Sequence, residues 1–410
     1  NFFNGTVPGG CGRCHIGNGE FTPDQGAANP EEAWKKIDCL LCHATTYKVN
    51  GVTINAAGKR LAVKNAQDKL VFPFPSGDDL KVTSASIKRV PAAEACSRCH
   101  SYNGGGYTFK RGLDYLVDDV HYSKGLTCTN CHETDAHKIA LSRPDPALVG
   151  RDQLDEISMM KNRCENCHSD APHSEAPGAQ MLNMHTAKLD CGTCHVPFHK
   201  GMSNKRFDIP VHELANGAFK QWNFQLDILQ PTRPVYRWWD GSVDHEHVRP
   251  RGARDANSKI SPFKITRAYV PVDKSTGVPI PLKLGVVFGA AEGSTPQEMQ
   301  AKLDASIRTG AKLTAARFGF PLDGEGNYTA EYEWKWDEMF GNPGHGVVRK
   351  GLTCADCHTP TGIMPFEELG YDASEAAMLR SIAVSTGSLS GAPAFSLGQV
   401  FLVTLACGVL

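Results

Sequence analysis

Seven copies of the motif Cys-x-x-Cys-His constrain this chain more than any other feature of its sequence, and together they use fourteen of its fifteen cysteines. The cysteine pairs are Cys11 and Cys14, Cys39 and Cys42, Cys96 and Cys99, Cys128 and Cys131, Cys164 and Cys167, Cys191 and Cys194, and Cys354 and Cys357. The histidines that follow them are His15, His43, His100, His132, His168, His195 and His358. This motif is the attachment signature of haem c, in which both sulfurs bond to the porphyrin and the imidazole binds the iron from the proximal side. The sequence therefore predicts seven covalently attached haem c groups.

Other uses of paired cysteines fit this pattern poorly. Zinc ribbons close their site with four protein ligands and need no histidine directly after the second cysteine. Disulfide frameworks are typical of short secreted chains, whereas this chain has 410 residues. Thioredoxin-like redox pairs do not recur seven times in one chain.

The composition agrees with a core built around cofactors. Hydrophobic residues make up 41% of the chain, which also contains 40 glycines and 25 prolines. We therefore expect a mainly α fold with much irregular structure, in which porphyrin fills much of the interior. The net charge of −1 leaves no basic field to attract nucleic acid, so we expect no nucleic-acid partner.

The haem motifs are unevenly distributed along the chain. The expected regions are a six-haem region at 1–204, a haem-free segment with short strands and a helix at 205–340, a seventh haem site at 341–372 and a hydrophobic tail at 373–410 that is uncharged after Arg380.

Within the haem-free segment, local patterns predict individual elements. Apolar patterning predicts strands at 260–270 and 280–288, with a turn at 273–277 between them. A helix is predicted at 295–308, because Thr295 can cap it, proline follows at the first position and glutamate comes three residues after the cap.

The two ends of the chain bear on its location. No charged residue follows Arg380, and residues 391–410 just reach the roughly twenty apolar residues of a spanning helix. We expect this tail to be a membrane or partner anchor, with a buried helix or strand as the alternative, and Cys407 within it to be a small buried apolar residue. Because haem c is attached outside the cytoplasm, we expect a periplasmic or cell-surface protein, with an export signal or a longer segment upstream of Asn1.

The histidines outside the motifs are candidates for the second axial ligand of each iron. Nine remain of the sixteen in the chain, and an electron-carrying haem iron usually has two axial ligands. The predicted distal ligands are His121, His137, His173, His185, His345 and His199. His212 is a weaker candidate, and the neighbouring His245 and His247 suit a surface role equally well. Methionine is a possible substitute ligand.

One segment after the third motif has a different character. Residues 104–106 are consecutive glycines, which let backbone approach a cofactor closely, and Lys110 follows them. A lysine amine can bind iron when burial keeps it neutral, so Lys110 is a candidate distal ligand of a catalytic haem. The alternative is a solvated surface lysine.

Matches inside and outside the haem motifs resemble the octahaem tetrathionate reductase family of multihaem cytochromes c, relatives of pentahaem nitrite reductase and hydroxylamine oxidoreductase. The matching stretches lie at 37–47, 96–112, 119–121, 164–173, 182–185, 188–197, 236–241, 260–264, 354–358 and 369–371, so the resemblance covers about residues 1–372. The chain has one attachment site fewer than that family, and the missing site would lie upstream of Cys11.

The resemblance implies a mostly helical, haem-packed fold with bis-histidine haems and one haem with lysine on its distal side. Lys110 matches that lysine, and the haem on Cys11 and Cys14 would be the one it binds. His121, His137, His173, His185 and His345 match distal-ligand positions. The tail is not part of the family's catalytic core and looks like that of membrane-attached members that work with quinone-linked partners.

Three functional interpretations follow. The first is an electron-transfer subunit between a membrane quinone-interacting subunit and other redox proteins or cytochromes. The second is a terminal reductase of tetrathionate, nitrite or hydroxylamine at the Lys110 haem, with Arg111 and Asp114 nearby in sequence. The third is a structural filament unit that stacks haems end to end.

Overall fold

A computed structural model describes much of the second half of the chain and shorter parts of the first. The described residues are 39–44, 47–49, 52–54, 63–64, 70–71, 84–91, 95–96, 119–132, 134–135, 137–139, 164–174, 178–200, 203–206, 208, 212–213, 219–220, 231–244, 246–247, 249–282 and 295–385. The first haem motif, Cys99 and His100 of the third, Lys110, His245 and the predicted tail segment 391–410 lie outside them.

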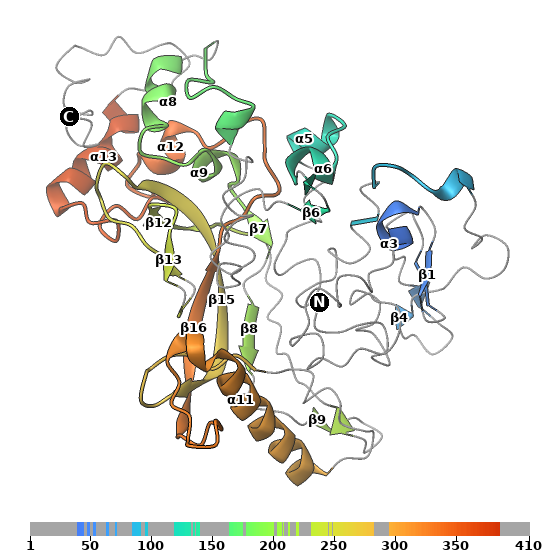
Figure 1. The fold of residues 1–410 in the computed structure, drawn as a ribbon. Helices are drawn as coiled ribbons and strands as arrows, with labels where there is room; N and C mark the ends of the chain where they lie inside the picture. Colours follow the sequence, from blue (N-terminus) through green and yellow to red (C-terminus); the bar gives the residue numbers. More distant parts are fainter. Residues whose placement is uncertain are drawn as a thin grey trace.

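A four-stranded sheet forms the centre of the described structure (Figure 1). Its longest strand is β15 (Lys259–Asp273), which pairs antiparallel with β12 (Val235–Trp239) along its first third. The rest of β15 pairs antiparallel with β16 (Tyr332–Gly341) and, over four residues, parallel with β8 (Ser203–Arg206). This sheet is larger than the mainly α class led us to expect, because β-branched and aromatic residues alternate along β15 and β16 and favour extended structure.

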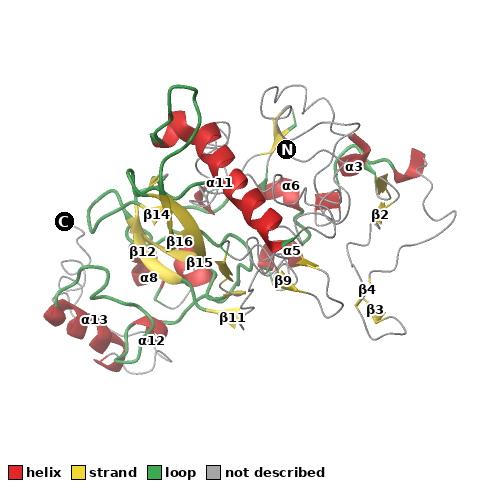
Figure 2. Cartoon of the chain, turned by 90° about the horizontal axis from the view of Figure 1, so that it is seen from below, coloured by secondary structure: helices red, strands yellow, loops and turns green. Residues whose placement is uncertain are grey.

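The long helix α11 (Pro296–Phe318) lies beside this sheet (Figure 2). Thr295 caps it through a reciprocal capping box with Glu298, and it ends at Gly319, whose φ of 71° is left-handed. Apolar residues at helical spacing face the core of the protein, where they pack against Val278, Ile280, Phe320 and Tyr328. The predicted helix is confirmed, and it continues ten residues beyond 308.

The two predicted strands of the haem-free segment differ in outcome. The first, at 260–270, is confirmed within β15, and the turn after Asp273 is also present. The second is wrong in its described part, since residues 280–282 lie outside any strand and only an isolated bridge joins Val272 to Pro279. Prolines on both sides of Ile280 lack the N–H groups that a sheet needs, and Ile280 packs into the α11 core instead.

The described haem motifs form single helical turns. These are α3 (Cys39–His43), α6 (Cys128–Cys131), the 3₁₀ turn η5 (Cys164–Asn166), α9 (Cys191–His195) and α12 (Cys354–Cys357). The helices α5 (Val120–Ser123) and α8 (Ala179–His185) carry non-motif histidines, and η3 (Ser84–Ser86) is a further short turn. A single turn places both cysteines and the histidine on one side of the backbone, which suits attachment to one porphyrin.

The remaining strands are short and form two-stranded pairs. They are β1 (Tyr47–Val49) with β2 (Val52–Ile54), β3 (Val63–Lys64) with β4 (Leu70–Val71), β5 (Thr134–Asp135) with β6 (Lys138–Ile139), β7 (His199–Lys200) with β11 (Pro231–Thr232), β9 (His212–Glu213) with β10 (Phe219–Lys220), and β13 (Val243–Asp244) with β14 (Arg249–Pro250).

The last described helix, α13 (Ala373–Ser385), begins where the hydrophobic tail was expected to start. Its Ala376 and Leu379 are buried in a core that also contains Trp238 and Phe366. α13 therefore packs against the seventh motif, and the expected boundary at 372/373 stays a prediction. Among the described residues, no helix combines the length and apolarity that crossing a membrane requires.

Candidate haem sites

Each described motif histidine faces one of the predicted distal histidines. The pairs, with the distance between ring centroids, are His43–His137 (6.2 Å), His168–His121 (6.1 Å), His132–His345 (6.1 Å), His195–His173 (6.1 Å) and His358–His185 (6.0 Å). Every pair joins a motif histidine to a histidine outside the motifs, and no histidine is used twice.

This separation fits two axial ligands of one iron. A metal–imidazole nitrogen bond is about 2 Å long and the ring centroid lies about 1 Å beyond the nitrogen, so two imidazoles on opposite sides of a metal have centroids about 6 Å apart. Within the described part of the chain, no group of three or more His, Cys, Asp or Glu side chains could hold a metal ion. Two protein ligands are what a haem iron needs, because the porphyrin supplies the other four nitrogens.

Hydrogen bonds orient the imidazoles on the motif side. The Nδ1 atoms of His43, His195 and His358 each lie 2.8 Å from a backbone carbonyl oxygen, of Lys88, Val348 and Leu379 respectively. A carbonyl oxygen only accepts, so Nδ1 is the donor in each case and Nε2 is left free to bind a metal.

Two of the non-motif histidines are oriented in the same way. The Nδ1 atom of His185 lies 2.8 Å from the carbonyl oxygen of Met181, one turn earlier in α8. The Nδ1 atom of His173 lies 3.0 Å from the Oδ1 atom of Asn183. In the His173–His195 and His185–His358 pairs, both imidazoles therefore have Nε2 free to bind a metal.

Burial also favours the metal-binding form of one motif histidine. Burial lowers the pKa of His358, and this effect outweighs the opposing hydrogen bond to the carbonyl of Leu379. The neutral imidazole is the form that binds a metal.

The cysteines of the second motif are not enclosed by protein. Cys39 and Cys42 are both exposed, and so is Cys167 of the fifth motif, whereas the other described motif cysteines are half-buried. Exposure leaves the Cys42 thiol accessible to the edge of a porphyrin. The assignment of Cys42 as an attachment residue stays a prediction.

The sixth and seventh motifs lie side by side. Burial, and then the neighbouring Cys354 and Asp356, raise the pKa of the Cys194 thiol to about 11. Burial, and then Cys194, raise the pKa of Cys357 to about 12. The backbone is equally close, because the amide of Leu352 donates to the carbonyl of Cys194 at 3.0 Å.

The fourth and fifth motifs are neighbours as well. Burial, and then the charges of Asp119 and Cys167, raise the pKa of the Cys131 thiol. The two haem attachment sites therefore lie close together, although their sequence positions are separated by residues outside the described part of the chain.

Three other candidate histidines lie within the described residues, namely His199, His212 and His247. His199 is buried in β7, and the described residues do not include His15 or His100, the two motif histidines it could face. His212 lies in β9. His247 lies 3.3 Å from the carboxylate of Asp337 and is partly exposed, in line with the surface role considered for it.

Sequence reasoning missed the groups that hold the ligands in place. Asn183 and the carbonyl oxygens of Lys88, Val348 and Leu379 come from distant segments and carry no local signal. Asp119 could have been found from its position two residues before a candidate ligand.

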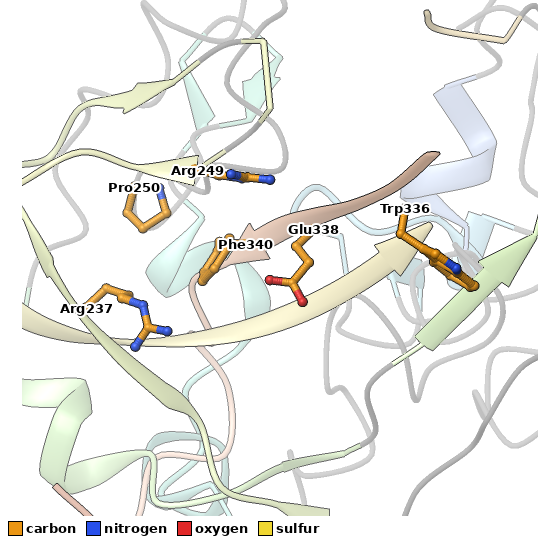
Figure 3. A pocket seen from close by; sticks show the side chains of 6 residues that line it. All are labelled: Arg237, Arg249, Pro250, Trp336, Glu338 and Phe340. Carbon is orange, nitrogen blue, oxygen red and sulfur yellow. The ribbon is translucent and has the colours of Figure 1, made fainter. Parts of the chain in front are cut away.

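A cavity of about 510 Å³ lies over the sheet (Figure 3). It is lined by Arg237, Arg249, Pro250, Trp336, Glu338 and Phe340, none of which belongs to a haem motif. Its charged residues already have partners: Arg237 pairs with Glu368, Arg249 with Asp337 and Glu338 with Arg267. This arrangement gives no sign of a cofactor site.

Parts of the chain match a family model and a known relative. Residues 200–361 match the family model described as "Cytochrome c bacterial". An uncharacterised protein of Archaeoglobus fulgidus is 31% identical over 148 residues, which are 33% of this chain and 48% of that protein, so the chain spans about half the length of this relative.

A solved structure resembles most of the chain. The octahaem cytochrome c from Shewanella oneidensis superposes with a TM-score of 0.55 and 23% identity, over 90% of this chain and 82% of that one. The chain thus has a multihaem cytochrome fold, and the family match together with the repeated attachment motif supports a c-type cytochrome that carries covalently bound haem.

Proposed function

We propose that this chain is an extracytoplasmic multihaem cytochrome c that carries electrons along seven closely spaced haems. The observation that carries this proposal is the one-to-one facing of five motif histidines with five other histidines at 6.0–6.2 Å. Haem c, when bound, supplies an iron that takes up and releases one electron. The protein's own contribution is to hold that iron between two fixed imidazoles.

The described residues favour an electron carrier over a catalyst at these five sites. Substrate reduction at an iron needs an exchangeable coordination position, and an iron held by both imidazoles of such a pair would have none. The Nδ1 hydrogen bonds of His43, His195 and His358 hold the rings in place, which keeps structural change small when the charge changes.

Short chain segments connect one haem site to the next. His132 and His137 are five residues apart and face different partners, so their sites must be close. His168 and His173 are related in the same way.

Contacts between motifs also connect neighbouring sites among the five described ones. Cys131 lies near Cys167, and Cys194 lies near Cys354. Among the described sites, the series runs from Cys39 and Cys42 through Cys128 and Cys131, Cys164 and Cys167, and Cys191 and Cys194 to Cys354 and Cys357.

The partners in this proposal are other redox proteins, namely further cytochromes or a membrane quinone-interacting subunit. Its support is the uncharged sequence after Arg380, which includes the apolar residues 391–410. These residues would attach the cytochrome to a membrane or to such a subunit.

A second candidate is a terminal reductase of tetrathionate, nitrite or hydroxylamine. The glycine-rich segment that ends at Lys110 favours it, because a lysine amine binds iron only while it is neutral, and its protonation would free the coordination position. The haem on Cys11 and Cys14 would be the site of that reaction. His15 and Lys110 both lie outside the described residues.

One experiment tests both candidates. The purified protein is weighed intact to count attached haems, its iron spin states are measured by electron paramagnetic resonance, and the reduced protein is mixed with each of the three compounds. A carrier has only low-spin irons that the three compounds do not reoxidise. Rapid reoxidation that is lost in Lys110→Ala and kept in Lys138→Ala would favour the reductase. A protein without covalent haem would contradict both.

A further inference from the structure

The buried carboxylate of Asp119 joins two segments that are far apart in the chain. Its Oδ1 atom accepts hydrogen bonds from the backbone N–H groups of His121 (2.9 Å) and Tyr122 (3.4 Å). Its Oδ2 atom accepts from those of Gly346 (3.0 Å) and Val347 (2.9 Å). Only 4% of Asp119 is exposed, so these four donors take the place of water.

Each of the two segments carries a histidine of a different pair. His121, in α5, faces His168, while His345 precedes Gly346 directly and faces His132. The Oδ1 atom of Asp119 is also 3.4 Å from the Nδ1 atom of His121. One side chain therefore contacts the backbone at His121 and directly after His345, the ligand candidates of two neighbouring sites.

In the described part of the chain, a single basic side chain lies next to the carboxylate of Asp119. Among the described residues, no lysine or arginine forms an ion pair with it, and His121 is its one basic neighbour. The same charge acts on Cys131, an attachment residue of the haem site that His132 and His345 define. A negative charge in a buried environment favours the more positive, oxidised state of a nearby iron.

We propose that Asp119 is a positioning residue shared by the haem on Cys128 and Cys131 and the haem on Cys164 and Cys167, and that its charge lowers the reduction potentials of both. This inference rests on the proposed function, since it requires the two facing pairs to be axial ligands. The two haems would then form a low-potential step within the series of described sites.

The test compares the reduction potentials of the wild-type protein and the Asp119→Asn variant by optical redox titration, with electron paramagnetic resonance to follow individual haems. Two haems should shift to more positive potentials while the others stay unchanged. Asp119→Glu keeps the charge and should leave those two potentials closer to the wild-type values than Asn does.

A buried aspartate elsewhere supplies the matched control. Asp273 is 0% exposed and accepts hydrogen bonds from Tyr328, Ser275 and Thr276, none of which is a candidate ligand. Asp273→Asn should leave every haem potential unchanged.

The outcomes separate this inference from the proposed function. Unchanged potentials in a folded Asp119→Asn variant, or equal shifts at all haems, would overturn the role of Asp119 alone. If the variant loses stable ligation, high-spin signals from two haems support shared positioning, whereas general loss of haem or of fold overturns it. A wild-type protein without low-spin bis-histidine haems would overturn the proposed function itself.

Discussion

The imidazoles of His173 and His195 lie nearly parallel, with their planes 10° apart and their centroids 6.1 Å apart. The planes of His43 and His137, by contrast, meet at 70°. The mutual angle of two axial imidazoles affects how the iron d orbitals split, so these two sites should differ in spectrum even though their ligand type is the same.

We therefore expect at least two classes of low-spin signal in electron paramagnetic resonance spectra of the oxidised protein. The site with nearly perpendicular rings should give the more anisotropic signal. His137→Met should remove that signal and leave the His173–His195 signal in place. A single uniform class of signal would contradict the geometry of these pairs.

Removing one facing histidine should open one iron. In His185→Ala, the haem on Cys354 and Cys357 should become five-coordinate and bind carbon monoxide when reduced, by one equivalent per chain more than the wild type. His247→Ala is the control, because His247 contacts Asp337 rather than a motif histidine. Equal carbon monoxide binding by both variants would argue against His185 as a ligand.

Gly351 lies where the seventh motif approaches the sixth. A Cβ atom there would be 3.0 Å from the carbonyl oxygen and 3.3 Å from the Cβ atom of Cys194, in the sixth motif. Gly351→Ala should lower the free energy of unfolding by about 1–3 kcal/mol, as overpacking does, measured by thermal denaturation. Gly324→Ala, where no atom lies within 4 Å, should have little effect.

The Asp273 carboxylate should make stability depend on acid pH. Burial alone would raise the pKa of Asp273, but hydrogen bonds from Ser275, Tyr328 and Thr276 outweigh it and hold the pKa below its ordinary value. The unfolded state then binds more protons, so this contribution is full above the unfolded pKa of about 3.9 and is lost as pH falls through the lower folded pKa.

Denaturant midpoints measured between neutral and strongly acid pH check this expectation. Asp273→Asn should reduce stability at neutral pH and flatten the acid dependence. An unchanged slope in the variant would assign the acid sensitivity to other groups.

Two truncations separate α13 from the sequence that follows it. Ending the chain after Ser385 should keep the haem spectrum and release the protein from the membrane fraction of the cells that make it. Ending it after Asp372 should also disturb the haem on Cys354 and Cys357, because the carbonyl oxygen of Leu379 holds the Nδ1 atom of His358. Retention of the first truncation in the membrane fraction would rule out the proposed anchor.

Local features of this protein could be read directly from its residues. Haem attachment depends on five consecutive residues, and the start of α11 depends on Thr295, Pro296 and Glu298. Such signals act over one helical turn, so no long-range contact is needed to recognise them. The histidines available as second ligands could also be identified from the sequence, since they are those that lie outside the motifs.

The pairing of those histidines depended on contacts between distant segments. His345 faces His132, and Asp119 binds the amide of Val347, across long stretches of chain whose spacing carries no periodic signal. The exposure of Cys42 also depends on contacts between distant segments, because the motif itself does not determine how much protein surrounds it. The docking of α13 on the last haem motif also depends on packing, because burial of apolar surface selects partners by shape and not by sequence proximity. Covalent chemistry is encoded locally, whereas the identity of the group opposite each motif histidine arises from packing.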